Sequence, residues 1–439
     1  MKKVLTIVVI LVVIAVLGGP FFTAKLARQG LEQQVALINE MPGYQAELVN
    51  YQKGWFSATT QMHVGIDETA LANNPGMEEV GDLGFLMDID IVHGPLLLRD
   101  TTGVGLVAAT GTLNEDNTPA LTEFRELAGL DTLMTYEQVT NLLGVSSYVV
   151  AVPAFDVADD NSEFVFGGFE VAGDYDLKSR MLTGQGALAE TRVVSANSTM
   201  VFDAMTFDYD LELVNWALQL GEQNMTMPGV RVYPGKDTSS EPIMLLQNLV
   251  IVSDADYDSD ETVTVKMNVA LDKVNAQGMQ LEGFNFDFLI ERFSVKAIDQ
   301  FMEMYQNAMA SMADPELAQM QMAMGGMALA PEILQQSPVF AIPDLSLKLN
   351  GEPLTANARI EVHADGLDMA TVTANPQPLL QKLVAGLNLE VSDGLMQQFG
   401  AFLGGQQAMM EKTETGYRVQ FSMKDGAATL NGQPLPPLF

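Results

Sequence analysis

Cysteine is absent from this chain of 439 residues, and histidine is scarce. Without a thiol the chain has no disulfide, no thiolate metal site and no cysteine nucleophile. The histidines, His63, His93 and His363, stand far apart and lack metal-binding spacing such as H-E-x-x-H. The motifs G-x-S-x-G and S-x-x-K, which mark activated serines, do not occur. The sequence therefore predicts no catalytic residue, no metal ligand and no cofactor, and it favours a protein that is not an enzyme.

Basic residues are also few, and the acidic excess limits the partners that the chain can bind. Lys and Arg number 22 against 56 Asp and Glu, a formal net charge of −34. Four basic and no acidic residues fall within residues 1–30, so the other 18 basic and 56 acidic residues leave the remainder at −38. Nucleic acid is excluded as a partner, because carboxylates repel a phosphate backbone. Broad docking on anionic lipid head groups is disfavoured for the same reason.

The N-terminal segment predicts a membrane anchor over residues 1–23. Lys2 and Lys3 precede an apolar run that begins at residue 4 and extends past residue 17. About 19 residues at 1.5 Å each nearly match a hydrocarbon core of roughly 30 Å. The lysines place the N-terminus in the cytoplasm and the rest of the chain outside. A cleaved signal peptide is the alternative, but residues 18–24 place a proline and two phenylalanines where cleavage needs small side chains.

Strand signals dominate the remainder of the chain. We expect a juxtamembrane helix and linker over residues 24–50 and one body over residues 51–439. In residues 263–271, valine, methionine and leucine alternate with mostly polar side chains, and residues 201–211 and 284–290 follow the same period of two. A further alternation over residues 164–177 is broken at Gly167 and Gly168. This pattern is typical of antiparallel strands with one covered and one wetter face.

Helical periodicity interrupts the strands in several places. Apolar residues recur at three- and four-residue spacing over 298–312, and Asp314-Pro315 has the form of a helix start that leads into residues 316–324. We expect a helical pair over residues 378–407 and one or two helices over 121–145. The fold class is therefore α+β: an N-terminal transmembrane helix, then a long curved antiparallel sheet with helices packed on it or at its ends.

Two short segments echo each other. Leu-Asn-Gly-Glu-Pro-Leu at residues 349–354 resembles Leu-Asn-Gly-Gln-Pro-Leu at residues 430–435, and each copy follows a strand-like segment. Asn-Gly favours the positive φ angles of a tight hairpin turn. The echo indicates either a duplicated strand–turn unit or the coincidence of two similar turns.

Three motifs carry a family resemblance. They are Tyr-Gln-Lys-Gly-Trp-Phe-Ser at residues 51–57, Ile-Val-His-Gly-Pro-Leu at residues 91–96 and the terminal segment 430–435. With the N-terminal anchor, they make the chain resemble the YdgA-like family of bacterial inner-membrane proteins. The resemblance implies a single span in the bacterial inner membrane, a periplasmic body and self-association. It supplies no catalytic residues.

The residues of these motifs are the candidate site residues: Gly54, Trp55, Phe56, Ser57, His93, Gly94, Pro95, Asn431, Gly432 and Pro434. We interpret them as structural, with glycines that supply turns and aromatics that lock the first hairpin to the core. The alternative is a ligand or partner contact at the Trp55–Phe56 pair. His93 is expected to end a strand.

The densest acidic run, residues 254–261, raises the question of calcium. Carboxylates at alternate positions are the hard oxygen ligands that calcium prefers. The EF-hand pattern fails, however, because Ser259 holds the glycine position and Val265 the final glutamate position. A solvated turn between two strands explains the run better.

Three functional hypotheses follow. The leading one is a non-enzymatic protein that binds lipid or another apolar ligand beside the membrane, since the anchor, the long strands and a total of 27 methionines suit adaptable apolar contacts. The alternative is a homodimeric scaffold or assembly factor for other envelope proteins. A hydrolase would need a pair of positioned carboxylates, and nothing singles out such a pair. Burial of the eight methionines between Met302 and Met327 would weaken the lipid hypothesis.

Overall fold

The computed structural model describes most of the body of the chain. Its ranges are 23–41, 43–66, 84–98, 102–114, 119–159, 161–215, 218–310, 325–326, 328–364, 367, 377–403 and 409–436. Apart from residue 23, the anchor predicted over residues 1–23 lies outside these ranges, and so does the helix predicted over 316–324. Within them, no helix has both the length and the apolar character needed to cross a membrane.

Antiparallel strands make up most of the described chain, as the period-two alternation predicts. The first strands are β1 (Tyr44–Lys53), β2 (Ser57–Ile66), β3 (Phe85–His93), β4 (Leu96–Leu98), β5 (Thr102–Val104), β6 (Val107–Asn114), β7 (Thr135–Thr140), β8 (Val145–Val152), β9 (Phe155–Ala158), β10 (Glu163–Phe166), β11 (Phe169–Asp176), β12 (Met181–Leu188), β13 (Thr191–Val194), β14 (Ser198–Phe202) and β15 (Met205–Leu213). The later strands are β16 (Gln219–Pro234), β17 (Met244–Ser259), β18 (Thr262–Ala276), β19 (Met279–Ser294), β20 (Val339–Leu349), β21 (Glu352–Val362), β22 (Leu383–Ser392), β23 (Glu411–Lys412), β24 (Gly416–Lys424), β25 (Ala427–Leu430) and β26 (Gln433–Pro434).

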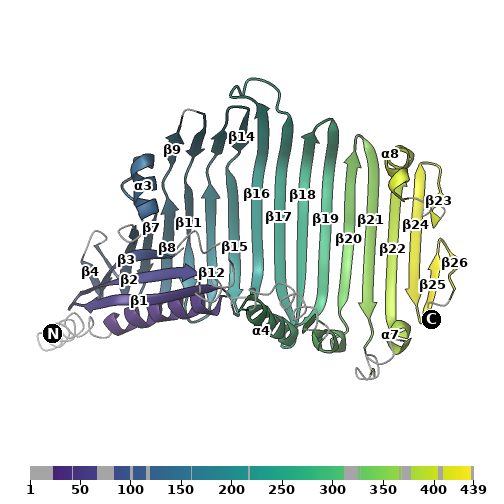
Figure 1. Cartoon of the computed structure of the whole chain (residues 1–439). Helices are drawn as coiled ribbons and strands as arrows, with labels where there is room; N and C mark the ends of the chain where they lie inside the picture. The colour runs from purple at the N-terminus through teal and green to yellow at the C-terminus, as the bar shows by residue number, and fades with distance from the viewer. Residues whose placement is uncertain are drawn as a thin grey trace, which may run out of the picture.

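These strands form one long sheet (Figure 1). In the described part of the chain the sheet has 24 strands, and β4 and β5 pair separately. The main hydrogen-bonded order is β1-β2-β3-β6-β7-β8-β11-β12-β15-β16-β17-β18-β19-β20-β21-β22-β24-β25-β26. A second series, β9-β10-β13-β14, joins the same sheet at β16, and β23 pairs with β24. The order follows the chain closely, so hairpins rather than long crossovers build the sheet.

A crease crosses part of the sheet. Two residues without strand structure separate β8 from β9, β10 from β11, β12 from β13 and β14 from β15. The predicted break at Gly167 and Gly168 is one of these four interruptions. At the crease the apolar series advances by three residues instead of two, as from Phe166 to Phe169. Such an irregularity shifts the alternation of side chains by one. The apolar series therefore continues along the chain on both sides of the crease.

The N-terminal helix packs on the face of the first strands, and the other helices lie at the ends of the strands (Figure 1). The helices are the N-terminal helix (residues 23–40), α3 (Pro119–Ala128), α4 (Val295–Ala310), residues 328–335, α7 (Gln377–Gln381) and α8 (Asp393–Leu403). The prediction of a helix over 298–312 is confirmed by α4, whose Val295 and Ile298 pack against a small core around Leu218, Leu220 and Val263.

One helix prediction is wrong in part. Residues 378–407 are not a helical pair, because β22 occupies Leu383–Ser392 between α7 and α8. The prediction of one or two helices over residues 121–145 is confirmed by α3, after which the segment continues into β7 (Thr135–Thr140). The apolar run of β22 fits either period, and its pairing with β21 and β24 decides for the sheet.

The sheet is open, and much of its surface meets solvent. The accessible surface is 25416 Å², whereas a compact monomer of 47.6 kDa is expected to expose about 16,000 Å². The side chains of the long strands are mostly half-buried on both faces, as the burial of β18 and β19 shows. Backbone pairing between strands therefore contributes more to this fold than a central core does.

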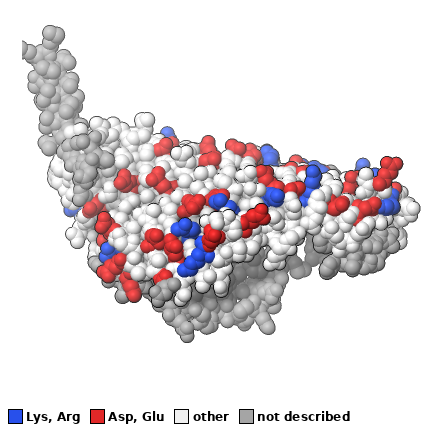
Figure 2. Space-filling view, turned by 90° about the horizontal axis from the view of Figure 1, so that it is seen from above, with Lys and Arg blue, Asp and Glu red and all other residues white. Residues whose placement is uncertain are grey.

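One face of the sheet is polar, and side chains bridge its strands. Asn224 donates to Asp208 at 2.9 Å, Asn285 donates to Asp344 at 2.7 Å, and Asn388 donates to Asn357 at 2.9 Å. Figure 2 shows acidic side chains spread along the molecule with lysine and arginine between them. Hydrogen bonds of this kind reinforce the register of the strands.

Two glycines of β12 make room for aromatic rings of β15. A Cβ atom added at Gly186 would clash with the ring of Phe207, and one added at Gly184 would lie 2.7 Å from Cζ of Tyr209. The rings therefore lie flat against the glycine strand, which keeps this part of the sheet thin.

We predict that Gly186→Ala lowers the free energy of unfolding by about 1–3 kcal/mol, because the added methyl group displaces the Phe207 ring. Gly386→Ala on β22 is the control, since nothing lies within 4 Å of its Cβ position. Its effect should stay within about 0.5 kcal/mol. Chemical denaturation followed by circular dichroism measures both. Equal effects of the two substitutions would contradict the close packing at Gly186.

Candidate functional site

The register of the sheet aligns apolar residues into one continuous row. Strand by strand, the row is Ile89, Gly111, Tyr136, Val150, Val171, Gly186, Phe207, Met225, Ile251, Val269, Phe286, Leu345, Ala356, Leu389 and Val419. Each member is the direct cross-strand partner of the next. We call the side of the sheet that carries this row the apolar face. It extends from β3 to β24, almost the whole length of the sheet.

Within the described chain, the N-terminal helix covers one end of the apolar face, and α4 covers one edge of it at Val263 and Val265. The N-terminal helix packs Ala27 and Leu31 against Ile89 and Ile91 in a buried core. From β8 onward, the members of the row are half-buried rather than buried. The described helices near these strands, α4, α7 and α8, lie at strand ends (Figure 1). An apolar surface thus runs out from under the N-terminal helix.

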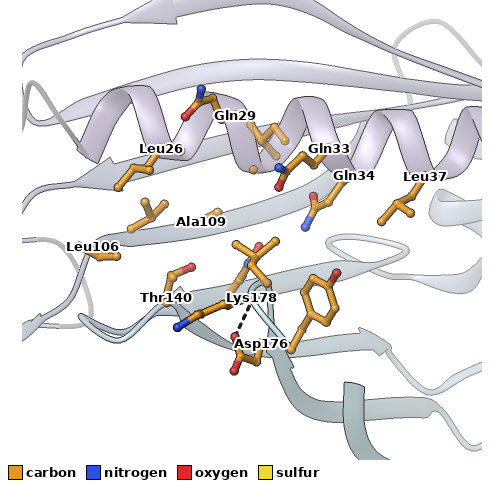
Figure 3. A pocket seen from close by; sticks show the side chains of 18 of the residues that line it. Leu26, Gln29, Gln33, Gln34, Leu37, Leu106, Ala109, Thr140, Asp176 and Lys178 are labelled. Atoms are coloured by element: carbon orange, nitrogen blue, oxygen red, sulfur yellow. Dashed lines mark hydrogen bonds between the residues drawn. The ribbon is translucent and has the colours of Figure 1, made fainter. Parts of the chain in front are cut away.

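A groove of about 580 Å³ lies where the apolar face passes out from under this helix. Leu26 and Leu37 line the groove from the helix (Figure 3). Ala109 of β6 and Leu106, which precedes β6, line it from the sheet. Ile91, Ala109 and Gln138 are successive cross-strand partners on the apolar face. The floor of the groove is therefore the apolar face itself, and its size suits a small apolar ligand.

Charged residues of the β11–β12 turn form one wall of the groove. Asp176 accepts hydrogen bonds from the backbone N–H of Lys178 at 2.9 Å and of Ser179 at 3.5 Å. These bonds lower the pKa of Asp176, so its carboxylate stays ionised and fixes the turn. Lys178 and Arg180 on the same turn also line the groove, which places both signs of charge at its edge.

Two tyrosines add polar groups to the apolar face near the groove. Tyr148 and Tyr209 meet through their hydroxyl groups, above Gly173 and Gly184, which pair between them. Burial raises the pKa of Tyr148, and the hydrogen bond with Tyr209 raises it further. The Tyr148 hydroxyl therefore remains protonated at neutral pH, and the tyrosine pair can donate a hydrogen bond to an uncharged or anionic group.

Two of the sequence motifs meet in one corner of the molecule. The turn at Gly54, Trp55 and Phe56 joins β1 to β2, and Ser57 opens β2 opposite Val92. The backbone N–H of His93 donates to the carbonyl of Phe56 at 2.9 Å. His93 ends β3, as predicted, and is fully buried. Separation in sequence hides this proximity, which only the pairing of β2 with β3 reveals.

The glycines and the proline of the two motifs shape the backbone of this corner. The N–H of Gly54 donates to the carbonyl of Ser57 at 2.7 Å, and the N–H of Gly94 to that of Leu106 at 3.1 Å. Gly94 adopts a φ of 136°, and Pro95 accepts from the N–H of Gly105 at 3.4 Å. These contacts agree with a structural role for the glycine turns.

The expected burial of the aromatics is wrong. Trp55 is 64% exposed and Phe56 40% exposed, so neither locks the first hairpin to the core. They lie in a turn that projects beyond the sheet, whereas the small Ala58 packs in the core in their place. The exposure of Trp55 favours the contact reading of this motif over the purely structural one.

The terminal motif lies at the opposite end of the sheet and matches its echo. Asn431 and Asn350 adopt positive φ angles of 50° and 52°, followed by glycines that do the same. Asn431 exchanges hydrogen bonds of 2.7 Å with the backbone of Gln420, through its own N–H and its Oδ1. Asn350 makes the equivalent pair with Gln280, at 2.6 and 2.9 Å. The two turns are thus one structural device used twice. Gly432 and Pro434 complete the second copy on either side of Gln433.

The acidic run and the remaining histidines form no metal site in the described chain. No group of three or more potential ligands is gathered there. Asp254 pairs with Lys266 at 3.1 Å, and Asp258 accepts from Thr264 and from the backbone of Arg292. The run lies at the end of β17 and in its hairpin. His63 and His93 lie at opposite ends of the paired strands β2 and β3, and His363 follows β21.

The fold and site define a class of protein: an open antiparallel sheet with one apolar face, which a helix covers at its N-terminal end. Residues 1–437 match the family described as "Bacterial protein of unknown function (DUF945)", and the chain belongs to this family. No curated protein matches the chain, and no solved structure matches it.

We predict that Asn431→Gly costs about 1 kcal/mol of stability, because it keeps the positive φ but loses the side-chain hydrogen bond to Gln420. Asn431→Ala should cost about 1–2 kcal/mol more, since alanine disfavours this backbone conformation. Thermal denaturation compares the two variants with the wild type. A Gly variant that is as unstable as the Ala variant would contradict the role of the φ angle.

Proposed function

We propose that this chain is a non-enzymatic protein of the bacterial inner membrane, anchored by its first 23 residues, with its body in the periplasm. Its function is to bind lipid, or another apolar ligand, along the apolar face of the sheet. The observation that carries this proposal is the row of half-buried apolar residues from β8 to β24, over which no described helix lies.

The size of the apolar face supports an interaction surface. With strands about 4.8 Å apart and about 3.4 Å per residue, the uncovered part measures about 50 Å by 20 Å, or roughly 1,000 Å². The largest apolar patch of a typical monomer covers about 300–600 Å². From the sequence, we expect burial of the eight methionines between Met302 and Met327 to weaken the lipid hypothesis. The structure describes the side chains of two of them, Met302 and Met304, and both are half-buried. The side chains of the other six lie outside the described part of the chain.

The position of the groove favours lipid as the ligand. The described part of the N-terminal helix follows the predicted anchor directly in the sequence, and it covers the first part of the apolar face. A ligand that leaves the bilayer beside the anchor would meet the groove first and the open face next. The acidic body disfavours broad contact with anionic head groups, so an apolar chain on the apolar face is the better fit.

A homodimeric scaffold is the second candidate, and the same face favours it. Two such faces packed together would bury roughly 2,000 Å² in total, which is enough for a stable dimer. The lipid and the dimer therefore compete for one surface, and one experiment separates them.

The test is native mass spectrometry of the full chain, released from membranes in a mild detergent. Ala356→Asp with Ala358→Asp adds two charges to β21 on the apolar face; Thr355→Asp with Asn357→Asp adds the same charges to the same strand on the polar face. The alanines are small, so their replacement opens no cavity. We expect lipid to accompany the wild type and the polar-face variant at a fixed ratio, and to be lost from the apolar-face variant.

The dimer makes a different prediction. A wild-type chain without lipid, at twice the monomer mass, and an apolar-face variant at the monomer mass would reject lipid binding in favour of the scaffold. Lipid that stays with both variants would also contradict the proposal, because it would then bind elsewhere.

Gly30 offers a test of the groove that separates binding from stability. It lines the groove, and nothing lies within 4 Å of its Cβ position. Gly30→Phe should fill the groove and weaken the uptake of a fluorescent fatty acid, while Gly30→Ala leaves the groove open. Both remove a helical glycine and should raise stability by about 0.5–1 kcal/mol. Equal uptake by the two variants would exclude the groove as the entry point.

A further inference from the structure

A second apolar surface lies at the corner where the two motifs meet. It comprises Trp55, Phe56, Leu96 and Val104, and we call it the aromatic corner. Leu96 is 40% exposed and Val104 63% exposed, in addition to the exposed Trp55 and Phe56. Neither the covered core nor the apolar face includes these side chains.

The members of the aromatic corner are contiguous. Phe56 and Leu96 line the same hollow, whose wall also includes Asp90. Leu96 is the cross-strand partner of Val104 in the β4–β5 hairpin. Leu97, the residue after Leu96, is buried. The hairpin therefore exposes the side chains of Leu96 and Val104 and covers that of Leu97. Trp55 precedes Phe56 in the same turn.

This corner lies beside the start of the N-terminal helix. The guanidinium of Arg28 lies 5.5 Å from the centre of the Tyr51 ring, near the end of β1. Leu26 lines the groove together with Leu106, whose carbonyl accepts from Gly94. Figure 1 shows the β1–β2 turn and β4 at the same end of the molecule as the first described residues of the N-terminal helix. The chain therefore enters the body next to the exposed aromatics.

Three basic side chains lie in the segments next to the aromatic corner, together with the acidic Glu32 and Asp90. Lys25 and Arg28 lie in the first turns of the helix, and Lys53 precedes the turn that holds Trp55. Arg28 pairs with Glu32 at 2.7 Å. Basic side chains next to tryptophan, phenylalanine and leucine are the combination that favours the interface of an anionic bilayer.

We propose that the aromatic corner inserts into the interface of the bilayer that holds the anchor. Trp55 and Phe56 would lie at the level of the lipid head groups, with Leu96 and Val104 beside them. The contact would fix the tilt of the body, and with it the direction in which the apolar face leaves the membrane. This inference rests on the anchor of the proposed function but not on any ligand of the apolar face.

The full chain in lipid vesicles tests this proposal through its tryptophan fluorescence. The sequence has two tryptophans, so Trp216→Phe, or Trp216→Tyr if that variant does not fold, leaves Trp55 as the only one. The vesicles contain phosphatidylcholine and phosphatidylglycerol, with or without bromine atoms on the upper part of the acyl chains. We expect the brominated lipid to remove about half of the Trp55 emission, as for an interfacial tryptophan.

A matched control places the only tryptophan elsewhere. Thr355→Trp, with both native tryptophans replaced by phenylalanine, puts it at an exposed position on the polar face of β21. Its emission should respond to aqueous iodide and not to bromine. Flotation with the vesicles reports on the anchor separately.

Three results would overturn the proposal. Trp55 that responds to iodide but not to bromine lies in water. Trp55 that responds to neither is covered by protein, such as a second copy of the chain. In both cases a chain that still floats leaves the anchor and the proposed function standing, whereas a chain that does not float rejects the anchor together with the corner.

Discussion

The alignment of alternating side chains across successive hairpins is the constraint on which the rest of this structure depends. Each strand places every second side chain on the same face, and each hairpin fixes the register with the next strand. A slip by one residue in any strand would put its polar side chains on the apolar face. The hydrogen bonds of Asn350 and Asn431 at their turns and of Asn285 and Asn388 on the polar face oppose such slips.

This constraint also explains why an open sheet can be stable with so little core. Antiparallel pairing satisfies the backbone polar groups along the whole sheet, while the two buried clusters, under the N-terminal helix and beside α4, secure one end and one edge. The apolar face between them is left half-exposed. A soluble protein rarely leaves so much apolar surface open without a use for it, and the groove under the helix gives this surface a direction.

The sequence predicts where the strands lie better than it predicts the register between them. Period-two alternation identifies β15, β18 and β19, and the Asn-Gly pairs identify two turns with positive φ. The alternation cannot show that Phe207, Ile251 and Phe286 stand in one row, because register depends on every turn between them. The strand β22 is missed because Leu-Val-Ala-Gly-Leu-Asn-Leu fits helical spacing as well.

The candidate site is predicted only in part. The motifs around Trp55 and His93 stand out in the sequence, but their proximity depends on the pairing of β2 with β3. Aromatic residues are usually buried, so composition points Trp55 toward the core; its place in a projecting turn decides otherwise. The groove combines a helix, β6 and the β11–β12 turn, and no local pattern joins segments so distant in sequence.

The most direct test of the central claim is a photocrosslinking scan along β21 in intact membranes. A photoreactive amino acid is placed in turn at each residue from 353 to 358, and adducts with lipid are identified by mass spectrometry. Our account predicts lipid adducts at residues 354, 356 and 358 and none at 353, 355 and 357, because alternate side chains occupy opposite faces. Adducts with a second copy of the chain at the even positions, or lipid adducts without alternation, would contradict it.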